Sequence, residues 1–259
     1  MSEQLNVEQH GTVRVLTIDR PESKNALHGP LRTALRTAMR AADHDDSVAA
    51  VVLTAADPVF SAGVDFKQLQ RGPDESGDPL DTTPAAAIRA MRKPVICAVN
   101  GACVSGALEI ALSCSFIVAS ERASFADTHA MLGVVPTWGL TALLPRAVGI
   151  RKAREMSISG AFVDATEALR IGLVNHVVPH EQLLPFALDL ADRVPATQAV
   201  GEMLDLYARG EDLSLAAALA LETSRSIGRK YDLAAFTAAG SRTAARQRGS
   251  QLPTAKGVP

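Results

Sequence analysis

The sequence predicts an α/β protein whose layered core is followed by an α-helical region at the C-terminal end. Short apolar runs of the buried-strand type alternate with helical patterns through the first part of the chain, whereas only helical spacing remains from about Pro195 onward. We therefore expect a core over residues 1–195 and a helical region over residues 196–259. With 259 residues, of which 47% are hydrophobic, the chain can bury a sizeable core.

The first predicted element is an N-terminal hairpin. Residues 7–18 alternate apolar and polar side chains around a break at His10-Gly11, which is typical of two antiparallel strands joined by a turn. The side chains expected to face inward are Val13, Val15 and either Leu16 or Ile18.

A helix and a buried strand come next. Leu31, Leu35 and Met39 recur at helical spacing, and the charged residues 43–46 close the pattern. Residues 48–54 form a continuous apolar run, which predicts a strand buried on both faces. Helix and strand thus begin to alternate along the chain.

The first of two strand-to-helix turns lies at residues 60–69. A strand end and Gly63 precede a short helix there, and Asp65 is placed to cap that helix. Residues 71–84 are rich in proline, glycine and acidic side chains and lack apolar periodicity. They predict a mobile surface loop.

The second strand-to-helix turn, between residues 99 and 106, leads into a helix that carries a candidate functional carboxylate. A buried strand at residues 95–99 breaks, and Ser105-Gly106 opens an Ala/Leu-rich helix. The first N–H groups of a helix lack intrahelical acceptors and attract negative groups, and Gly106 lets a ligand approach them closely. Glu109 lies three residues further on, on the same helix face. Taken alone, this pattern favours a simpler explanation, in which Ser105 caps the helix and Glu109 complements its dipole.

The two turns together predict a more specific chemistry. Each offers a backbone N–H, and Glu109 lies one turn inside the second helix. Two such donors stabilise a carbonyl oxygen that becomes an enolate oxyanion, while the carboxylate moves a proton at the neighbouring carbons. Because removal of one such donor costs about 2.7–4 kcal/mol in enzymes that use them, the pair is a stronger signal than either turn.

The remaining elements are expected to be short and to keep alternating. Strands are expected at residues 115–119, 123–125 and 173–178, and helices after Pro136, with Thr137 as a possible cap, and at residues 151–158, 165–171 and 181–194.

The composition favours a protein that handles small molecules. The net charge is −2, with no basic stripe for nucleic acid and no polybasic segment for a membrane surface. The apolar runs are too short to span a membrane, and residues 1–4 carry no leader pattern, so we expect a cytoplasmic protein. Cys97, Cys103 and Cys114 lack metal-ligand spacing, and the six histidines form no HxxxH or HxH pair, so no metal site is predicted.

Several ordered motifs resemble the crotonase, or enoyl-CoA hydratase/isomerase, superfamily. The resemblance extends from the hairpin to about Pro195 and more loosely through the helical region. The motifs are residues 24–27 (KNAL), 60–67 (FSAGVDFK), 98–101 (AVNG) with 105–109 (SGALE), 125–127 (FAD), 133–136 (GVVP) and 172–174 (GLV).

The resemblance implies a spiral of ββα turns that binds an acyl-CoA thioester, and C-terminal helices that build homotrimers or hexamers of paired trimers. It places the thioester oxygen between the N–H groups of Val64 and Gly106. Coenzyme A is part of the substrate, and no separate cofactor is implied. The residues implied to line the coenzyme A and thioester site are Lys24, Ala26, Ala62, Val64, Asp65, Phe66, Lys67 and Gly106.

By the same resemblance, Glu109 matches one of two glutamates that hydratases place around the α,β double bond. The second falls on His129 in this sequence. An imidazole titrates near pH 6.5, so His129 can move protons, although a packing histidine is also consistent with the pattern. Trp138 follows the proline motif, where a small residue is common, and is expected to be pocket wall or packing.

These residues predict an enoyl-CoA hydratase in which Glu109 and His129 form the proton-transfer pair. An enoyl-CoA isomerase that uses Glu109 as its single base is the alternative within enzymes. A catalytically silent acyl-CoA-binding protein is the alternative from another class, since the second glutamate is missing.

Overall fold

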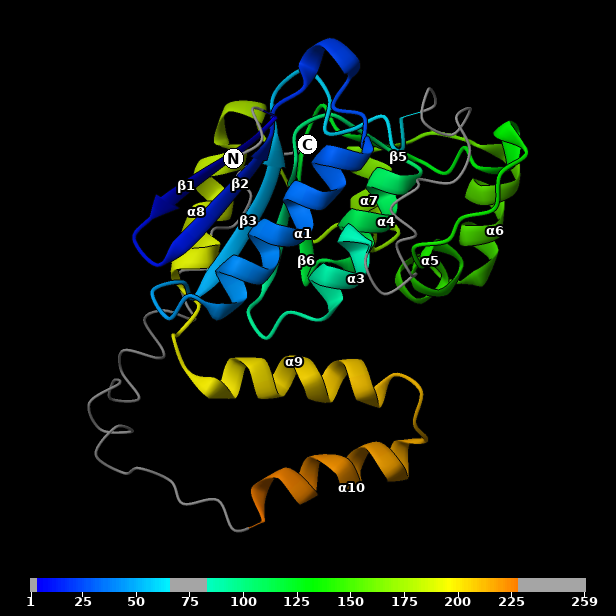
Figure 1. Cartoon of the computed structure of the whole chain (residues 1–259). Helices are drawn as coiled ribbons and strands as arrows, with labels where there is room; N and C mark the ends of the chain where they lie inside the picture. Colours follow the sequence, from blue (N-terminus) through cyan, green and yellow to red (C-terminus); the bar gives the residue numbers. More distant parts are fainter. Residues whose placement is uncertain (1–3, 66–82, 228–259) are drawn as a thin grey trace. The chain divides into compact units, whose positions relative to one another are not determined.

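The computed structural model describes residues 4–65 and 83–227 (Figure 1). The chain divides into two compact units, Met1–Ala196 and Thr197–Pro259. Strands occur only in the first unit among the described residues, and the described part of the second unit contains helices. The model is therefore of the mixed α/β class, with a helical C-terminal region.

A six-stranded sheet forms the centre of the first unit, with strand order β1-β2-β3-β4-β6-β9. Strand β1 pairs antiparallel with β2, and the other pairs are parallel. Parallel strands end at the same edge of a sheet, so the loops that follow β3 and β4 emerge side by side. The strands are β1 Leu5–His10, β2 Val13–Ile18, β3 Ala50–Ala55, β4 Val95–Val99, β6 Phe116–Ser120 and β9 His176–Val178.

Helices connect these strands, and a second, three-stranded sheet of order β5-β7-β8 lies beside them. The small sheet consists of β5 Ala102–Val104, β7 Ser124–Ala126 and β8 Val163–Asp164. The helices of this unit are α1 Gly29–His44, α3 Pro84–Arg89, α4 Gly106–Ser113, α5 Leu140–Val148, α6 Ile150–Ser159, α7 Ala165–Arg170 and α8 Leu183–Asp192, with 3-10 turns at η1 Pro21–Ser23, η3 Ala130–Leu132 and η4 His180–Gln182.

The inner strands β3, β4 and β6 are buried on both faces, which explains their continuous apolar sequences. Because side chains alternate along a strand, Val13 and Val15 join one hydrophobic cluster with α8, whereas Leu16 and Ile18 join the other with α1. Figure 1 shows α1 and α8 on opposite sides of the strands. Val13 and Val15, which the sequence predicts to face inward, are buried, and Leu16 and Ile18 are both buried although the prediction named them as alternatives.

The predicted hairpin, the first helix and the helices over residues 151–158 and 165–171 are confirmed. Helix α5 starts later than predicted and is not capped by Thr137, because its N-terminal cap residue is Gly139. Strand β9 covers only the last half of the predicted strand over residues 173–178.

The predicted loop over residues 71–84 is wrong at its end. Helix α3 begins at Pro84, and the hydroxyl of Thr83 caps it by accepting the N–H of Ala86 at 3.1 Å. Residues 71–82 lie outside the described part of the chain. The short strand β5 was also not predicted, since three residues are too few to show a periodic pattern.

The second unit contributes α9 Gln198–Gly210 and α10 Leu215–Ser226, which contact each other. The hydroxyl of Ser214 caps α10 by accepting the N–H of Ala217 at 3.3 Å. Arg225 pairs with Asp205 across the two helices. The helical pattern predicted for this region is confirmed over these residues.

Candidate active site

The two strand-to-helix turns predicted from the sequence lie against each other. Ser61, in the loop after β3, forms a parallel bridge with Cys103 of β5. The N–H of Ser61 donates to the carbonyl of Ala102 at 3.0 Å, and the N–H of Val104 donates to the carbonyl of Ser61 at 3.1 Å. These bonds hold the loop that carries Val64 beside the strand that leads into α4.

The backbone N–H groups of Val64 and Gly106 have no acceptor within the described residues. The N–H of Leu27 donates to the carbonyl of Gly63 at 2.8 Å, and the carbonyl of Leu27 accepts the N–H of Asp65 at 3.4 Å. Because successive residues of an extended segment point to opposite sides, the N–H of Val64 points away from Leu27. A Cβ built on Gly106 would lie 3.4 Å from the Val64 nitrogen, so the two donors frame one small site.

The turn before each donor has a positive φ. At Gly63 φ is +88°, and a Cβ there would lie 2.7 Å from the carbonyl oxygen of Val104, so glycine is required. Ser105 has φ +50° and ψ −109°, a conformation that costs a non-glycine residue about 1–3 kcal/mol.

Ser105 does not cap α4 with its side chain, so that prediction is wrong. Its hydroxyl instead lies 2.8 Å from the Thr128 hydroxyl and accepts the Thr128 N–H at 3.0 Å. The backbone conformation of Ser105 explains the missing cap, because it directs the hydroxyl toward the loop after β7 and away from the first turn of α4.

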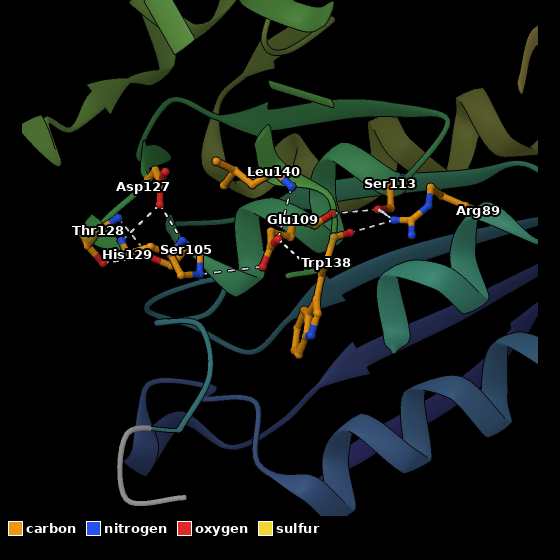
Figure 2. Close-up of polar contacts among 9 residues, drawn as sticks. All are labelled: Arg89, Ser105, Glu109, Ser113, Asp127, Thr128, His129, Trp138 and Leu140. Carbon is orange, nitrogen blue, oxygen red and sulfur yellow. Dashed lines mark hydrogen bonds and ion pairs between the residues drawn. The ribbon is translucent and has the colours of Figure 1, made fainter. Parts of the chain in front are cut away.

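Glu109 is buried, with 2% of its surface exposed. Its Oε1 accepts the backbone N–H groups of Trp138 at 2.7 Å and Leu140 at 3.2 Å (Figure 2). Burial raises the pKa of the Glu109 carboxyl above its usual value, although both hydrogen bonds and His129 oppose that rise. These N–H groups also explain the late start of α5, since the chain before it lies over the carboxylate.

His129 lies next to Glu109, as the predicted pair requires. Its Nε2 is 3.8 Å from Oε2 of Glu109, and its Nδ1 is 2.6 Å from Oδ1 of Asp127. Burial alone would raise the pKa of Asp127, but hydrogen bonds from His129 and Ser157 outweigh it and lower the pKa. An ionised Asp127 accepts a hydrogen bond from Nδ1–H of His129. In the neutral imidazole, this leaves Nε2 without a proton and directed at Glu109.

Asp127 is a residue of the site for which the sequence predicts no role. It accepts both the ring N–H and, at 3.2 Å, the backbone N–H of His129. The sequence signal that could have indicated this contact is the position of Asp127 two residues before His129 in a loop. Asp side chains in loops commonly accept the backbone N–H two residues further on.

Trp138 packs against the same site. Its Cζ3 would lie 3.4 Å from a Cβ on Gly106, and the Arg32 guanidinium lies 5.9 Å from the centroid of its ring. Its carbonyl accepts Nη1–H of Arg89 at 2.9 Å, and the same nitrogen donates to the Ser113 hydroxyl at 2.9 Å. These contacts hold the tryptophan whose N–H binds Glu109.

Two of the predicted coenzyme A segments are brought together at one edge of the unit. The N–H of Ala62 donates to the carbonyl of Lys24 at 3.0 Å. Arg20 donates through Nη1 to the carbonyl of Ala26 at 3.0 Å and to the carboxylate of Asp65 at 2.9 Å. Residues 24–26 and 62–65 are thus joined by hydrogen bonds, directly and through Arg20.

Phe66 and Lys67 lie outside the described residues, as does the helix that Asp65 was expected to cap. Over residues 4–65 and 83–227, no three His, Cys, Asp or Glu side chains gather as metal ligands. None of the helices in the described part of the chain has the length and apolar character needed to cross a membrane.

Comparisons with known proteins show the family to which the chain is similar. Residues 8–225 match the family model described as enoyl-CoA hydratase/isomerase. A probable enoyl-CoA hydratase of Rhizobium meliloti is 36% identical over 91% of this chain and 95% of its own length. The crystal structure of an enoyl-CoA hydratase from Mycobacterium tuberculosis is 44% identical, with a TM-score of 0.73 over 86% of this chain and 97% of that chain. A monofunctional enoyl-CoA isomerase from Mycobacterium smegmatis is 31% identical, with a TM-score of 0.74 over 84% and 99% of the two chains.

Proposed function

This chain belongs to the enoyl-CoA hydratase/isomerase family, and on that premise we propose that it adds water across the double bond of a 2-enoyl-CoA thioester. The observation that carries the proposal is the pairing of Glu109 with the His129–Asp127 unit beside two free backbone donors. Hydration needs two groups that exchange protons near the double bond, and this arrangement supplies two.

The thioester oxygen accepts the N–H groups of Val64 and Gly106. As water adds to C3, the π electrons move toward C1 and the thioester oxygen becomes an enolate oxyanion. Donors that are already in position stabilise that charge without reorganising, which is typically the largest contribution to such reactions. Their proximity to each other supports this role.

Glu109 and His129 then divide the proton transfers. The distance of 3.8 Å between Nε2 and Oε2 is too long for a hydrogen bond, but one water can contact both atoms. Nε2 takes a proton from this water as its oxygen bonds to C3, and the protonated carboxyl of Glu109 gives a proton to C2. The imidazolium returns its proton to the carboxylate through solvent, so the net change is addition of H and OH.

The raised pKa of Glu109 suits a proton donor, because burial favours its neutral form. The ionised Asp127 suits a partner that orients His129 and stabilises its imidazolium. These two environments push neighbouring carboxyl groups in opposite directions, a pattern that separates acid from base in enzyme sites.

We further propose that coenzyme A lies along residues 24–26 and 62–67, and that the helices after residue 196 build trimers or paired trimers. The first proposal is supported by the hydrogen bonds that join the described part of these segments. No separate cofactor is proposed, and a cytoplasmic location stays a prediction.

The test is direct. Purified protein mixed with crotonyl-CoA should remove the enoyl thioester absorbance and form 3-hydroxybutyryl-CoA. Absence of the hydroxyacyl product across short and medium 2-enoyl chains would reject hydration.

Isomerisation is the second candidate, because Glu109 alone can shuttle a proton between C2 and C4 of a 3-enoyl thioester. Two observations favour isomerisation as the alternative reaction: the second glutamate is missing, and the chain is similar in structure to the enoyl-CoA isomerase from Mycobacterium smegmatis. Conversion of 3-enoyl-CoA to 2-enoyl-CoA with solvent deuterium incorporation and no hydroxyacyl product would establish it. A silent binder would bind acyl-CoA and give neither product.

A second experiment tests the oxyanion donors. Gly106→Ala places a methyl group 3.4 Å from the Val64 nitrogen and 3.1 Å from Cγ2 of Val64, where the thioester oxygen should sit. Turnover should fall by about 10²–10³-fold. In a Glu109→Gln background, where the enoyl thioester persists, its absorbance shift on binding should also disappear. A normal shift would exclude Gly106 as a donor.

A further inference from the structure

Ser105 joins the two halves of the site that the proposed function needs. It precedes the donor residue Gly106, while Thr128 lies between Asp127 and His129. Strands β5 and β7 pair in parallel as far as Val104 and Ala126, and the N–H of Ser105 extends the ladder by donating to the carbonyl of Ala126 at 2.9 Å. Beyond that point, the Ser105 hydroxyl continues the connection by contacting the hydroxyl and the backbone N–H of Thr128.

The conformation of Ser105 makes this connection specific. Among the described non-glycine residues, only Lys24, Asn25 and Ser105 have a positive φ, and the φ of Ser105 is +50°. Strain of this kind persists where surrounding contacts determine it, and it clusters at functional sites. Four bonds hold Ser105 here, because its carbonyl also accepts the N–H of Glu109 at 3.0 Å. The serine is buried, with 7% exposed.

We infer that Ser105 and Thr128 are positioning residues whose hydroxyl pair aligns the oxyanion donor of Gly106 with the His129–Asp127 unit. Figure 2 shows Ser105 and Thr128 on neighbouring segments next to His129. The Thr128 N–H and hydroxyl both bond the Ser105 hydroxyl, so the turn that carries the imidazole docks on the residue that sets the direction of the Gly106 N–H. Neither side chain is assigned a contact with the reacting atoms.

This inference rests on the proposed function, and four variants test it in the full-length protein. Ser105→Ala removes the hydroxyl and keeps the strained φ, whereas Ser105→Gly removes the hydroxyl and relieves the strain. Thr128→Val removes the second hydroxyl at nearly constant shape, and Thr128→Ser retains it as the matched control. Because glycine suits the backbone at this position, Ser105→Gly keeps the test valid if Ser105→Ala fails to fold.

Ser105→Ala, Ser105→Gly and Thr128→Val should each lower kcat for crotonyl-CoA hydration by about 10-fold or more, with KM changed by less than about threefold. Thr128→Ser should retain kcat near the parent value. The Ser105→Ala, Thr128→Val double variant should lose no more than either single variant, since both break one contact. Each damaging variant should also reduce the absorbance shift of enoyl thioester bound in the Glu109→Gln background.

A purely structural role gives different results. If the variants lower the melting temperature but leave kcat and the absorbance shift at parent values, the inference is overturned. Multiplicative losses in the double variant would overturn it as well. If the parent hydrates no enoyl-CoA, the proposed function fails, and the absorbance shift of bound thioester alone then decides whether Ser105 and Thr128 position the donor.

Discussion

Glu109 and His129 face each other, yet the protein holds them in different ways. Glu109 lies inside helix α4, and its carboxylate is held by N–H groups 29 and 31 residues further along the chain. His129 lies one residue before the 3-10 turn η3, and its imidazole is held by Asp127, only two residues away. The carboxylate is therefore fixed by tertiary structure and the imidazole chiefly by its own turn.

The two groups also differ electrostatically. Burial raises the pKa of Glu109, whereas hydrogen bonds from His129 and Ser157 lower the pKa of Asp127. A carboxyl group whose pKa is raised by burial thus faces an imidazole that is hydrogen-bonded to a carboxyl group whose pKa is lowered. In the proposed hydration mechanism, the histidine–aspartate unit has the role of the second glutamate, with the imidazole placed between the two carboxyl groups.

The largest expected effect is that of Glu109→Gln. The amide keeps the shape and can accept the same N–H groups, but it cannot transfer a proton, so kcat should fall by about 10²–10⁴-fold. Acyl-CoA affinity, measured by titration calorimetry, should stay near the parent value. Unchanged turnover would show that His129 carries the chemistry without Glu109.

Substitution of His129 should have the next largest effect. His129→Ala should lower kcat by about 10²-fold and remove a limb of the pH–rate profile that reflects an imidazole, which is measured from the rate of hydration between pH 5 and 9. His129→Glu should retain hydration and move that limb toward lower pH, unless repulsion from Glu109 raises the pKa of the new carboxyl. An unchanged profile in His129→Ala would mean that the imidazole only packs.

Asp127→Asn should have a smaller effect, because Asp127 acts through His129. The amide can still bond the ring but cannot stabilise the imidazolium by charge, so kcat should fall about 10-fold with little change in KM. The same substitution in a His129→Ala background should cost almost nothing, since the group it orients is absent. Equal losses in both backgrounds would assign Asp127 a role independent of the imidazole.

The smallest effects concern stability. A raised pKa for Glu109 means that the folded protein binds its proton more tightly than the unfolded chain, so this contribution is present at low pH and is lost as pH rises above about 4.3. The lowered pKa of Asp127 has the opposite sign, and its contribution is lost as pH falls below about 3.9. Denaturant unfolding at about pH 3 and pH 7 should show Glu109→Gln gaining stability relative to the parent at the higher pH. Asp127→Asn should lose stability relative to the parent at the higher pH, and parallel behaviour of the two variants would contradict the contrast.

The sequence by itself determined the parts of the site that depend on local spacing. Glu109 and Gly106 share the start of one helix because they are three residues apart, and Asp127 can reach His129 because they are two apart. The alternation of apolar residues likewise determined the N-terminal hairpin, and the apolar spacing of Leu31, Leu35 and Met39 determined the first helix.

Tertiary structure decided what joins these local pieces. The pairing of β5 with β7 brings His129 to Glu109, and the chain before α5 places its N–H groups over the carboxylate. The same pairing turns Ser105 from the expected helix cap into a partner of Thr128, 23 residues away. Such contacts leave no periodic trace in a sequence, because their geometry depends on a parallel ladder whose strands are only three residues long and on packing between segments distant in the chain.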